Sequence, residues 1–175
     1  MQLKTLLNRV HPVKGFVYRK VQTVSDKLAP NGVRIEVHVR ERGGSRPICS
    51  VCGNKGPAYD RLAERRFEFV PLWGLAVALV YAMRRVDCRH CGAVTVEAVP
   101  WASGKSSLTK AYAYFLSAWA KRMSWAEVAG AFKTSWESVF RSVEMVVTWG
   151  LQHRNLEGVA SIGIDEVLCS EATSS

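Results

Sequence analysis

Two short stretches, "CSVCG" (residues 49–53) and "CRHCG" (residues 88–92), share one pattern: two cysteines separated by two residues and followed by glycine. A two-residue spacer lets one tight turn direct both sulfurs at the same point. The glycine can take the left-handed backbone conformation that closes such a turn. Two such turns supply four thiolates, a ligand set that zinc binds as a tetrahedron. We therefore predict a structural zinc site formed by Cys49, Cys52, Cys88 and Cys91.

A single CxxC pair also occurs in redox motifs and among buried thiols, so these are the alternatives for each pair alone. The first 16 residues have no long apolar core and do not resemble a secretory signal. We expect a cytoplasmic protein, in which paired cysteines favour metal over disulfide. His90, inside the second pair, is a competing ligand that we do not favour, and the lone Cys169 is not expected to bind metal.

The 35 residues between the two cysteine pairs are expected to fold as a β-hairpin. Residues 65–70 alternate between apolar and polar side chains for a few positions, and "PLWG" (71–74) is rich in turn-forming residues. Within 75–86, Leu75, Val77, Leu79, Tyr81 and Met83 fall on one face at period two. A hairpin returns its ends to the same place, which would bring Cys52 near Cys88. Upstream, residues 33–40 alternate without error, which places Glu36 and its polar neighbours on the outer face. We predict a small β-rich, zinc-binding domain over residues 1–100.

The net charge of +9 lies in this predicted domain. Residues 1–100 hold 17 Lys and Arg against 8 Asp and Glu, whereas residues 101–175 hold 7 against 7. A basic surface suggests an anionic partner such as double-stranded DNA, and a solvated basic face is the alternative. Some of these cations can simply neutralise the zinc thiolates. Those predicted to contact phosphates are Arg65, Arg66, Arg84 and Arg85.

No membrane partner is expected from the hydropathy pattern. The longest apolar run covers the 12 residues 72–83. A helix that crosses a bilayer needs about 20 apolar residues. Together with the basic charge, this predicts a cytoplasmic, nucleoid-associated protein.

After residue 100 the periodicity becomes helical, which predicts an all-α domain over residues 101–155. Capping boxes are predicted where Ser124 precedes Glu127 and where Thr134 precedes Glu137. They mark helices near 125–131 and 135–149, joined by a tight turn as in a helix-turn-helix. An ordinary helical hairpin is the alternative. The residues predicted to contact DNA are Lys133, Ser135, Trp136, Glu137, Ser138, Arg141 and Ser142, with a place in the core left open for Trp136.

The chain resembles the transposases of the ISL-three insertion-sequence family over residues from about 10 to 166. The resemblance rests on "CSVCG…CRHCG", "YDRLAERRFEFVPLWG" (59–74), "VPW" (99–101), "SWAEVAGAFKTSWESVFRSV" (124–143) and "IGIDE" (162–166). It implies zinc-binding and helix-turn-helix domains that dock on terminal inverted repeats. It also implies an RNase H-like domain in which three carboxylates hold two Mg²⁺ ions, with Asp165 matching the first of them.

Ten residues follow Asp165, and they do not resemble the family's continuation. Glu166 points to the opposite face of the expected strand, and Glu171 lies in a polar tail. We therefore expect a truncated transposase, inactive alone, whose residues 156–175 begin a catalytic domain. Mg²⁺ would matter only if that domain were complete. The expected class is α+β: a β-rich zinc domain, a helical domain and one orphan strand.

Three alternatives stay open: a standalone DNA-binding regulator, a piece of a complete enzyme, and a zinc-stabilised interaction module. The oligomeric state is also open, with a homodimer or an association with full-length transposase as the options.

Overall fold

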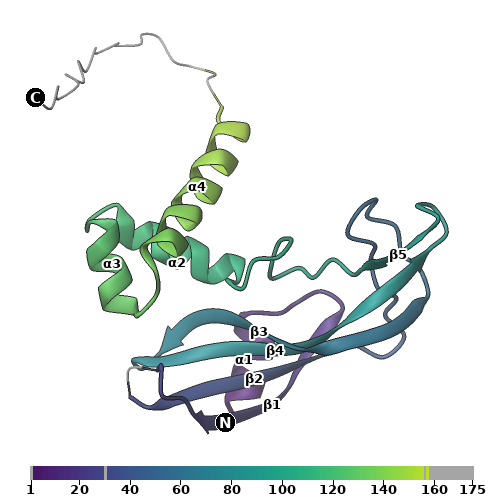
Figure 1. Ribbon diagram of the computed structural model, residues 1–175, viewed down its shortest axis with the longest axis horizontal. Helices are drawn as coiled ribbons and strands as arrows, with labels where there is room; N and C mark the ends of the chain where they lie inside the picture. Colours follow the sequence, from purple (N-terminus) through teal and green to yellow (C-terminus); the bar gives the residue numbers. More distant parts are fainter. Residues whose placement is uncertain (1, 30, 156, 158–175) are drawn as a thin grey trace, which may run out of the picture.

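The computed structural model describes residues 2–29, 31–155 and 157, which form a mixed fold with one sheet and four helices (Figure 1). The mixed class agrees with the prediction, although the first helix was not anticipated. The predicted strand at 159–164 lies outside the described residues. In chain order the elements are α1 (Leu3–Val10), β1 (Phe16–Ser25), β2 (Val33–Glu41), β3 (Ala58–Leu72), β4 (Leu75–Cys88), β5 (Ala93–Val96), α2 (Lys110–Ala120), α3 (Trp125–Phe132) and α4 (Trp136–Gln152).

The sheet has the strand order β1-β2-β4-β3, with β5 added beside β4. β2 runs parallel to β4 and pairs only with its first part, Ala76–Val80. The last part of β4, Arg85–Cys88, therefore pairs with β5 instead. Because β3 and β4 extend past the other strands, they carry the second cysteine pair to one end of the sheet (Figure 1).

The predicted hairpin is confirmed by the antiparallel pairing of β3 with β4. Its turn consists of Trp73 and Gly74, which both have positive φ angles, 52° and 75°. This is the turn geometry that matches the right-handed twist of the two strands. β3 begins at Ala58, earlier than the alternation from residue 65 indicated.

One face of the sheet carries the main core. Phe67, Leu79 and Tyr81 are almost completely buried there. Trp101 closes this core, with its ring edge-to-face against Phe16 and Tyr81 at centroid distances of 4.8 and 5.5 Å. The core of the sheet therefore includes side chains just past residue 100.

The predicted exposure of Glu36 on β2 is wrong, because this residue is only 4% exposed. Its carboxylate accepts hydrogen bonds from Arg66 Nε at 2.7 Å and from Gln22 Nε2 at 3.3 Å. Desolvation on burial raises the pKa of Glu36, but the hydrogen bonds outweigh it, so the net pKa is lowered. The alternation correctly placed the apolar residues of β2, while cross-strand pairing buried one of its polar residues.

α1 covers the start of β1, and Leu7 contributes to the main core. The amide of Asn8 bonds the backbone of Tyr18 in both directions: its Nδ2 donates to the carbonyl at 3.1 Å and its Oδ1 accepts from the N–H at 3.2 Å. This contact supplies hydrogen-bond partners for backbone groups of β1, an edge strand, next to a register shift in its pairing with β2.

α2, α3 and α4 share a second core around Leu116, Val128 and Val139, each 0% exposed. The chain reaches this bundle along the outer edge of β3. There the Glu68 N–H donates to Ser107 O at 2.7 Å and the Thr109 N–H donates to Glu68 O at 2.9 Å. None of the helices in the described part of the chain is long and apolar enough to cross a membrane.

The capping box at Ser124 and Glu127 is confirmed. The one predicted at Thr134 is wrong, because α4 starts one residue later. Ser135 is its N-cap, and the Ser135 hydroxyl accepts from the Ser138 N–H at 3.1 Å. Lys133 is the C-cap of α3 and has the left-handed conformation, with φ 51°. Only Thr134 then separates it from Ser135, the N-cap of α4.

This cap assignment predicts different effects for two neighbouring substitutions. Ser135→Ala should lower the free energy of unfolding by about 1 kcal/mol, because an N–H of the first turn of α4 loses its acceptor. Thr134→Ala should change the free energy of unfolding by only a few tenths of a kcal/mol, because Thr134 is not the N-cap. Urea unfolding followed by circular dichroism measures both, and a larger loss for Thr134→Ala would contradict the assignment.

Candidate metal centre and nucleic-acid interface

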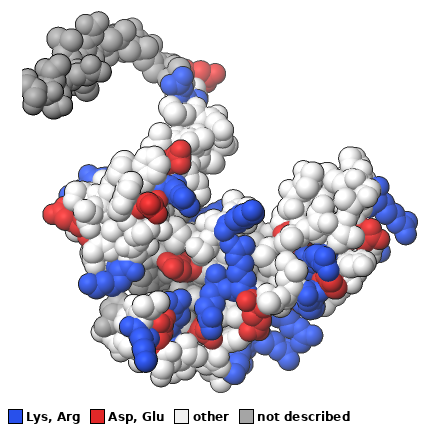
Figure 2. All heavy atoms as spheres, viewed as in Figure 1, with Lys and Arg blue, Asp and Glu red and all other residues white. Residues whose placement is uncertain are grey.

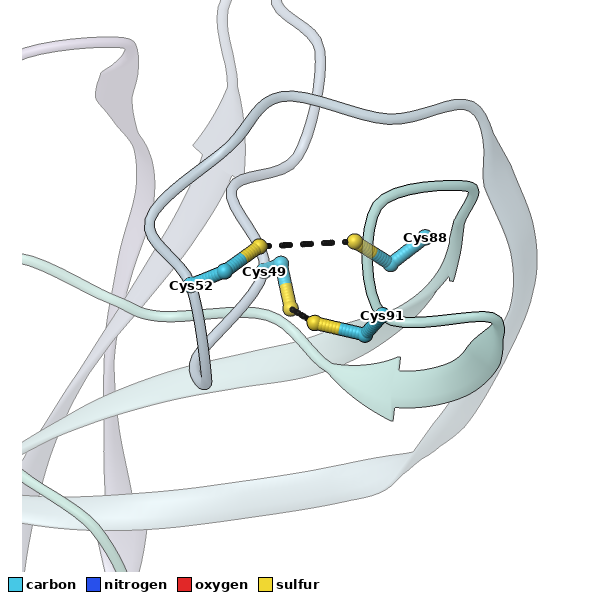
Figure 3. A group of neighbouring side chains, drawn as sticks. All are labelled: Cys49, Cys52, Cys88 and Cys91. Carbon is cyan, nitrogen blue, oxygen red and sulfur yellow. Dashed lines mark hydrogen bonds between the residues drawn. The ribbon is translucent and has the colours of Figure 1, made fainter.

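The four predicted cysteine ligands converge at one end of the sheet. Their sulfurs lie within 4.8 Å of one another. The Sγ–Sγ distances are 3.5 Å for Cys52 and Cys88 and 3.8 Å for Cys49 and Cys91 (Figure 3). One pair comes from the β2–β3 connection and the other from the turn between β4 and β5. A tetrahedron with Zn–S bonds of about 2.3 Å has edges of about 3.8 Å, so the donor set and its spacing fit zinc.

The backbone of both turns has the conformation expected of the glycines: Gly53 and Gly92 have φ angles of 72° and 64°. The first turn also supplies donors to sulfur, from the Val51 N–H to Cys49 at 3.4 Å and from Asn54 Nδ2 to Cys52 at 3.5 Å. Such contacts orient thiolates and stabilise their charge.

Thr95 on β5 lies closest to a cysteine sulfur, with its hydroxyl 3.1 Å from Cys49 Sγ. This hydrogen bond is the main cause that lowers the pKa of Cys49 to about 6. The hydrogen bond with Cys52 and the surrounding sulfurs raises the pKa of Cys91 to about 12. The Cys91 thiol therefore ionises beside its neighbouring sulfurs only with difficulty unless a cation balances the charge. His90 is exposed and does not belong to the cluster, and Cys169 lies outside the described residues.

Below the metal centre, Arg84 and Glu97 form a buried ion pair. Arg84 is 4% exposed, and its Nη2 lies 2.7 Å from Glu97 Oε2. The other Glu97 oxygen accepts from the Arg84 N–H and from the Tyr81 hydroxyl, each at 2.7 Å. The predicted phosphate contact for Arg84 is therefore wrong, because its guanidinium is committed to this network. The signal that sequence reasoning missed was Glu97, an acid between the apolar residues of "VTVEAV" (94–99).

The other three arginines of the predicted phosphate-binding set also have partners within the protein. Arg66 pairs with Glu36, and Arg85 Nε donates to Asp60 at 2.6 Å. Arg65 donates to the carbonyls of Lys105 and Ser106. Arg66 and Arg85 still expose part of their side chains, at 65% and 39%.

Some cations near the metal centre and along the sheet have no ion pair among the described residues. Figure 2 shows a band of Lys and Arg atoms across the middle of one face, with acidic atoms beside it. This unpaired set includes Arg40, Arg42, Arg46, Lys55 and Arg89.

The predicted DNA-contacting residues of the helical part fall into two groups. Trp136 is 57% exposed, so its alternative place in the core is wrong, and Ser135 and Lys133 are also exposed. Ser142 is 1% exposed and its hydroxyl donates to Ser138 O at 2.6 Å, so its predicted exposure is wrong.

α4 exposes both charged and apolar side chains. Arg141 is exposed and lines a groove with Lys110 at the start of α2. Phe140 and Val147 are 41% and 52% exposed. α4 therefore presents an apolar stripe as well as polar residues.

Comparison with known proteins finds similarity to two curated transposases. Both are named transposase for insertion sequence element IS1557, from the CDC 1551/Oshkosh and ATCC 25618/H37Rv strains of Mycobacterium tuberculosis. Each is 32% identical over 143 residues, which cover 79% of this chain and 32% of the relative. The chain thus spans about a third of the length of these relatives. No protein-family profile matches the chain, and no solved structure matches it.

Proposed function

We propose that this chain is the DNA-recognition part of an insertion-sequence transposase and binds the terminal inverted repeats of its element. The observation that carries the proposal is the similarity to two transposases over 79% of the chain. We propose two domains, a zinc-binding one over residues 1–100 and a helical one over 101–155. A catalytic segment would begin at residue 156.

In this proposal the helical domain reads sequence and the basic sheet supplies affinity. We propose that α3, the turn at Lys133–Ser135 and α4 form a helix-turn-helix, which is supported by a short helix, a tight turn and a longer second helix. In that motif the first turn of the second helix meets base edges in the major groove. Trp136 and Ser138 lie in that turn, with Lys133 and Ser135 just before it. The exposed cations of the sheet would contact phosphates, which adds affinity that falls as salt rises.

Among insertion-sequence transposases, we propose the ISL-three family for this chain, because the chain resembles the motifs of that family. In that family the catalytic domain would hold Mg²⁺ through three carboxylates, the first at Asp165. The position of Asp165 lies outside the described residues, so this role stays a prediction. We propose that catalysis requires a domain beyond this chain, supplied by a full-length transposase.

The second candidate is a zinc-stabilised interaction module, and one observation favours it. Trp136, Phe140, Val147 and Leu151 lie on one side of α4 and are each at least 41% exposed. An apolar stripe of this kind is typical of contact with another protein. Substituting Phe140 and Val147 by Ser separates the two candidates: an unchanged affinity for DNA with loss of self-association would assign the stripe to protein contact.

Arg141→Ala should weaken binding to the preferred duplex by about 1–3 kcal/mol while leaving binding to unrelated DNA almost unchanged, if Arg141 contacts a base edge. Lys121→Ala, a change of the same charge at the exposed C-cap of α2, is the matched control and should affect neither. Fluorescence anisotropy with both duplexes at several salt concentrations measures this. Equal losses on the two duplexes would place Arg141 on a phosphate.

A further inference from the structure

A cavity of about 490 Å³ opens beside the zinc end of the sheet, separate from the cysteine cluster and from α4. Three segments meet there: the start of β1, the β2–β3 connection and the chain that leaves β5. The size lies within the range of about 300–1,000 Å³ typical of small-ligand sites. The residues that line it are Lys14, Gly15, Phe16, Gly44, Ser45, Arg46, Ile48, Lys55, Arg84, Glu97, Ala98, Val99 and Pro100.

Three cations of this lining are available to a ligand. Lys14, Arg46 and Lys55 are exposed and have no ion pair among the described residues. Glu97 is the only acid among the lining residues, and it is paired with Arg84. The cavity therefore presents three uncompensated positive charges, which favour an anion with at least one phosphate.

The remaining wall is mainly apolar and contains one unpaired polar group. Phe16 and Val99 are buried beneath the cavity, and Ile48 is 39% exposed. The Ser45 hydroxyl is buried and has no hydrogen-bond partner in the described structure. An apolar wall with one unsatisfied donor is typical of a site that holds a flat, partly polar group and orients it through one hydrogen bond.

We propose that this cavity binds one nucleotide, with the phosphate on Lys14, Arg46 and Lys55 and the base against the apolar wall beside Ser45. The proposal rests on the proposed DNA-binding function and assigns a second contact to it, on an unpaired nucleotide of a DNA strand. Stacked duplex bases cannot enter a cavity. The phosphates of a duplex would therefore contact the three cations, but no duplex base would contact the apolar wall. A free nucleotide has the same chemistry and is the other source to be tested.

The experiment compares two triple variants that lose the same charge. The first is Lys14→Ala, Arg46→Ala and Lys55→Ala. The control is Arg19→Ala, Lys20→Ala and Lys27→Ala, exposed cations outside the cavity that have no ion pair within the described part of the chain. Both lower the net charge of +9 by three. The probes are a blunt duplex, the same duplex with a short unpaired thymidine tail, and thymidine monophosphate as a competitor.

We expect the wild type and the control to bind the tailed duplex about tenfold more tightly than the blunt one, the gain of one charge-assisted contact. The cavity variant should lose this preference. On the tailed duplex, the magnitude of the slope of log affinity against log salt concentration should also decrease by about 0.7, the value for one phosphate of a single strand. Ser45→Ala should reduce the preference without changing the slope. Competition by the monophosphate at low concentration would identify a free nucleotide as the occupant.

Equal affinity of the wild type for blunt and tailed duplexes, with no competition by the monophosphate, would overturn the inference. Equal losses in the two triple variants would also overturn it, because they would show charge alone. A third outcome is that the protein does not bind the blunt duplex but binds the tailed one, and that this binding is lost in the cavity variant. This result would refute the proposed duplex recognition and would still support the nucleotide site.

Discussion

A Cys52→Ser variant should lose zinc and unfold the β-rich part of the chain. The segments around the metal centre have little core of their own, since Cys49, Val86 and Cys88 are the buried residues of that cluster. The four sulfurs join the β2–β3 connection to the turn after β4, so removal of one ligand releases both. Structural zinc provides apparent binding free energies of about 10–16 kcal/mol in zinc-finger peptides, and this becomes folding free energy.

Zinc content by atomic absorption and thermal melting by circular dichroism measure the effect. Cys169→Ser is the matched control, a change of the same kind at the cysteine outside both CxxC pairs, and it should retain zinc. Unchanged zinc content and melting in Cys52→Ser would refute the metal centre. Loss of zinc without unfolding would show that the main core of the sheet is sufficient alone.

Glu97→Ala should lower the free energy of unfolding by about 3–5 kcal/mol, because it leaves the Arg84 guanidinium buried without a counter-charge. The side chains of Arg84 and Glu97 are 5% and 1% exposed. Tyr81 also loses the acceptor of its hydroxyl. Burial first, and then the bond to Glu97, hold the pKa of Tyr81 above its usual range.

Asp60→Ala is the control for this prediction, because it removes an arginine partner at the surface. Asp60 and Arg85 are 41% and 39% exposed, and such pairs contribute about 0–1 kcal/mol. Urea unfolding followed by tryptophan fluorescence compares the two variants. Similar small losses would show that the network beneath the metal centre adds no stability.

The parts of the fold that were predictable depend on local chemistry. The CxxCG pairs, the strand over residues 75–86 and the Ser124 cap each follow from spacing between near neighbours, and the structure confirms them. The cysteine cluster was predictable for the same reason, since a hairpin necessarily returns its ends. α1 is short, with eight residues, and it was missed.

The parts that were not predictable depend on contacts between distant residues. Glu36, Arg84 and Ser142 are polar and were assigned to the surface, but partners far along the chain or one helical turn away satisfy them in the interior. The parallel pairing of β2 with β4 also lacks a local signal.

The most direct test of DNA recognition is selection of bound duplexes from a random pool by the zinc-loaded chain at near-physiological salt. We predict enrichment of one motif that matches an inverted repeat near the gene, and loss of this enrichment when Trp136 and Arg141 are replaced by Ala. Binding that enriches no motif and disappears as salt rises would contradict sequence-specific recognition, because it would show only electrostatic attraction to phosphates.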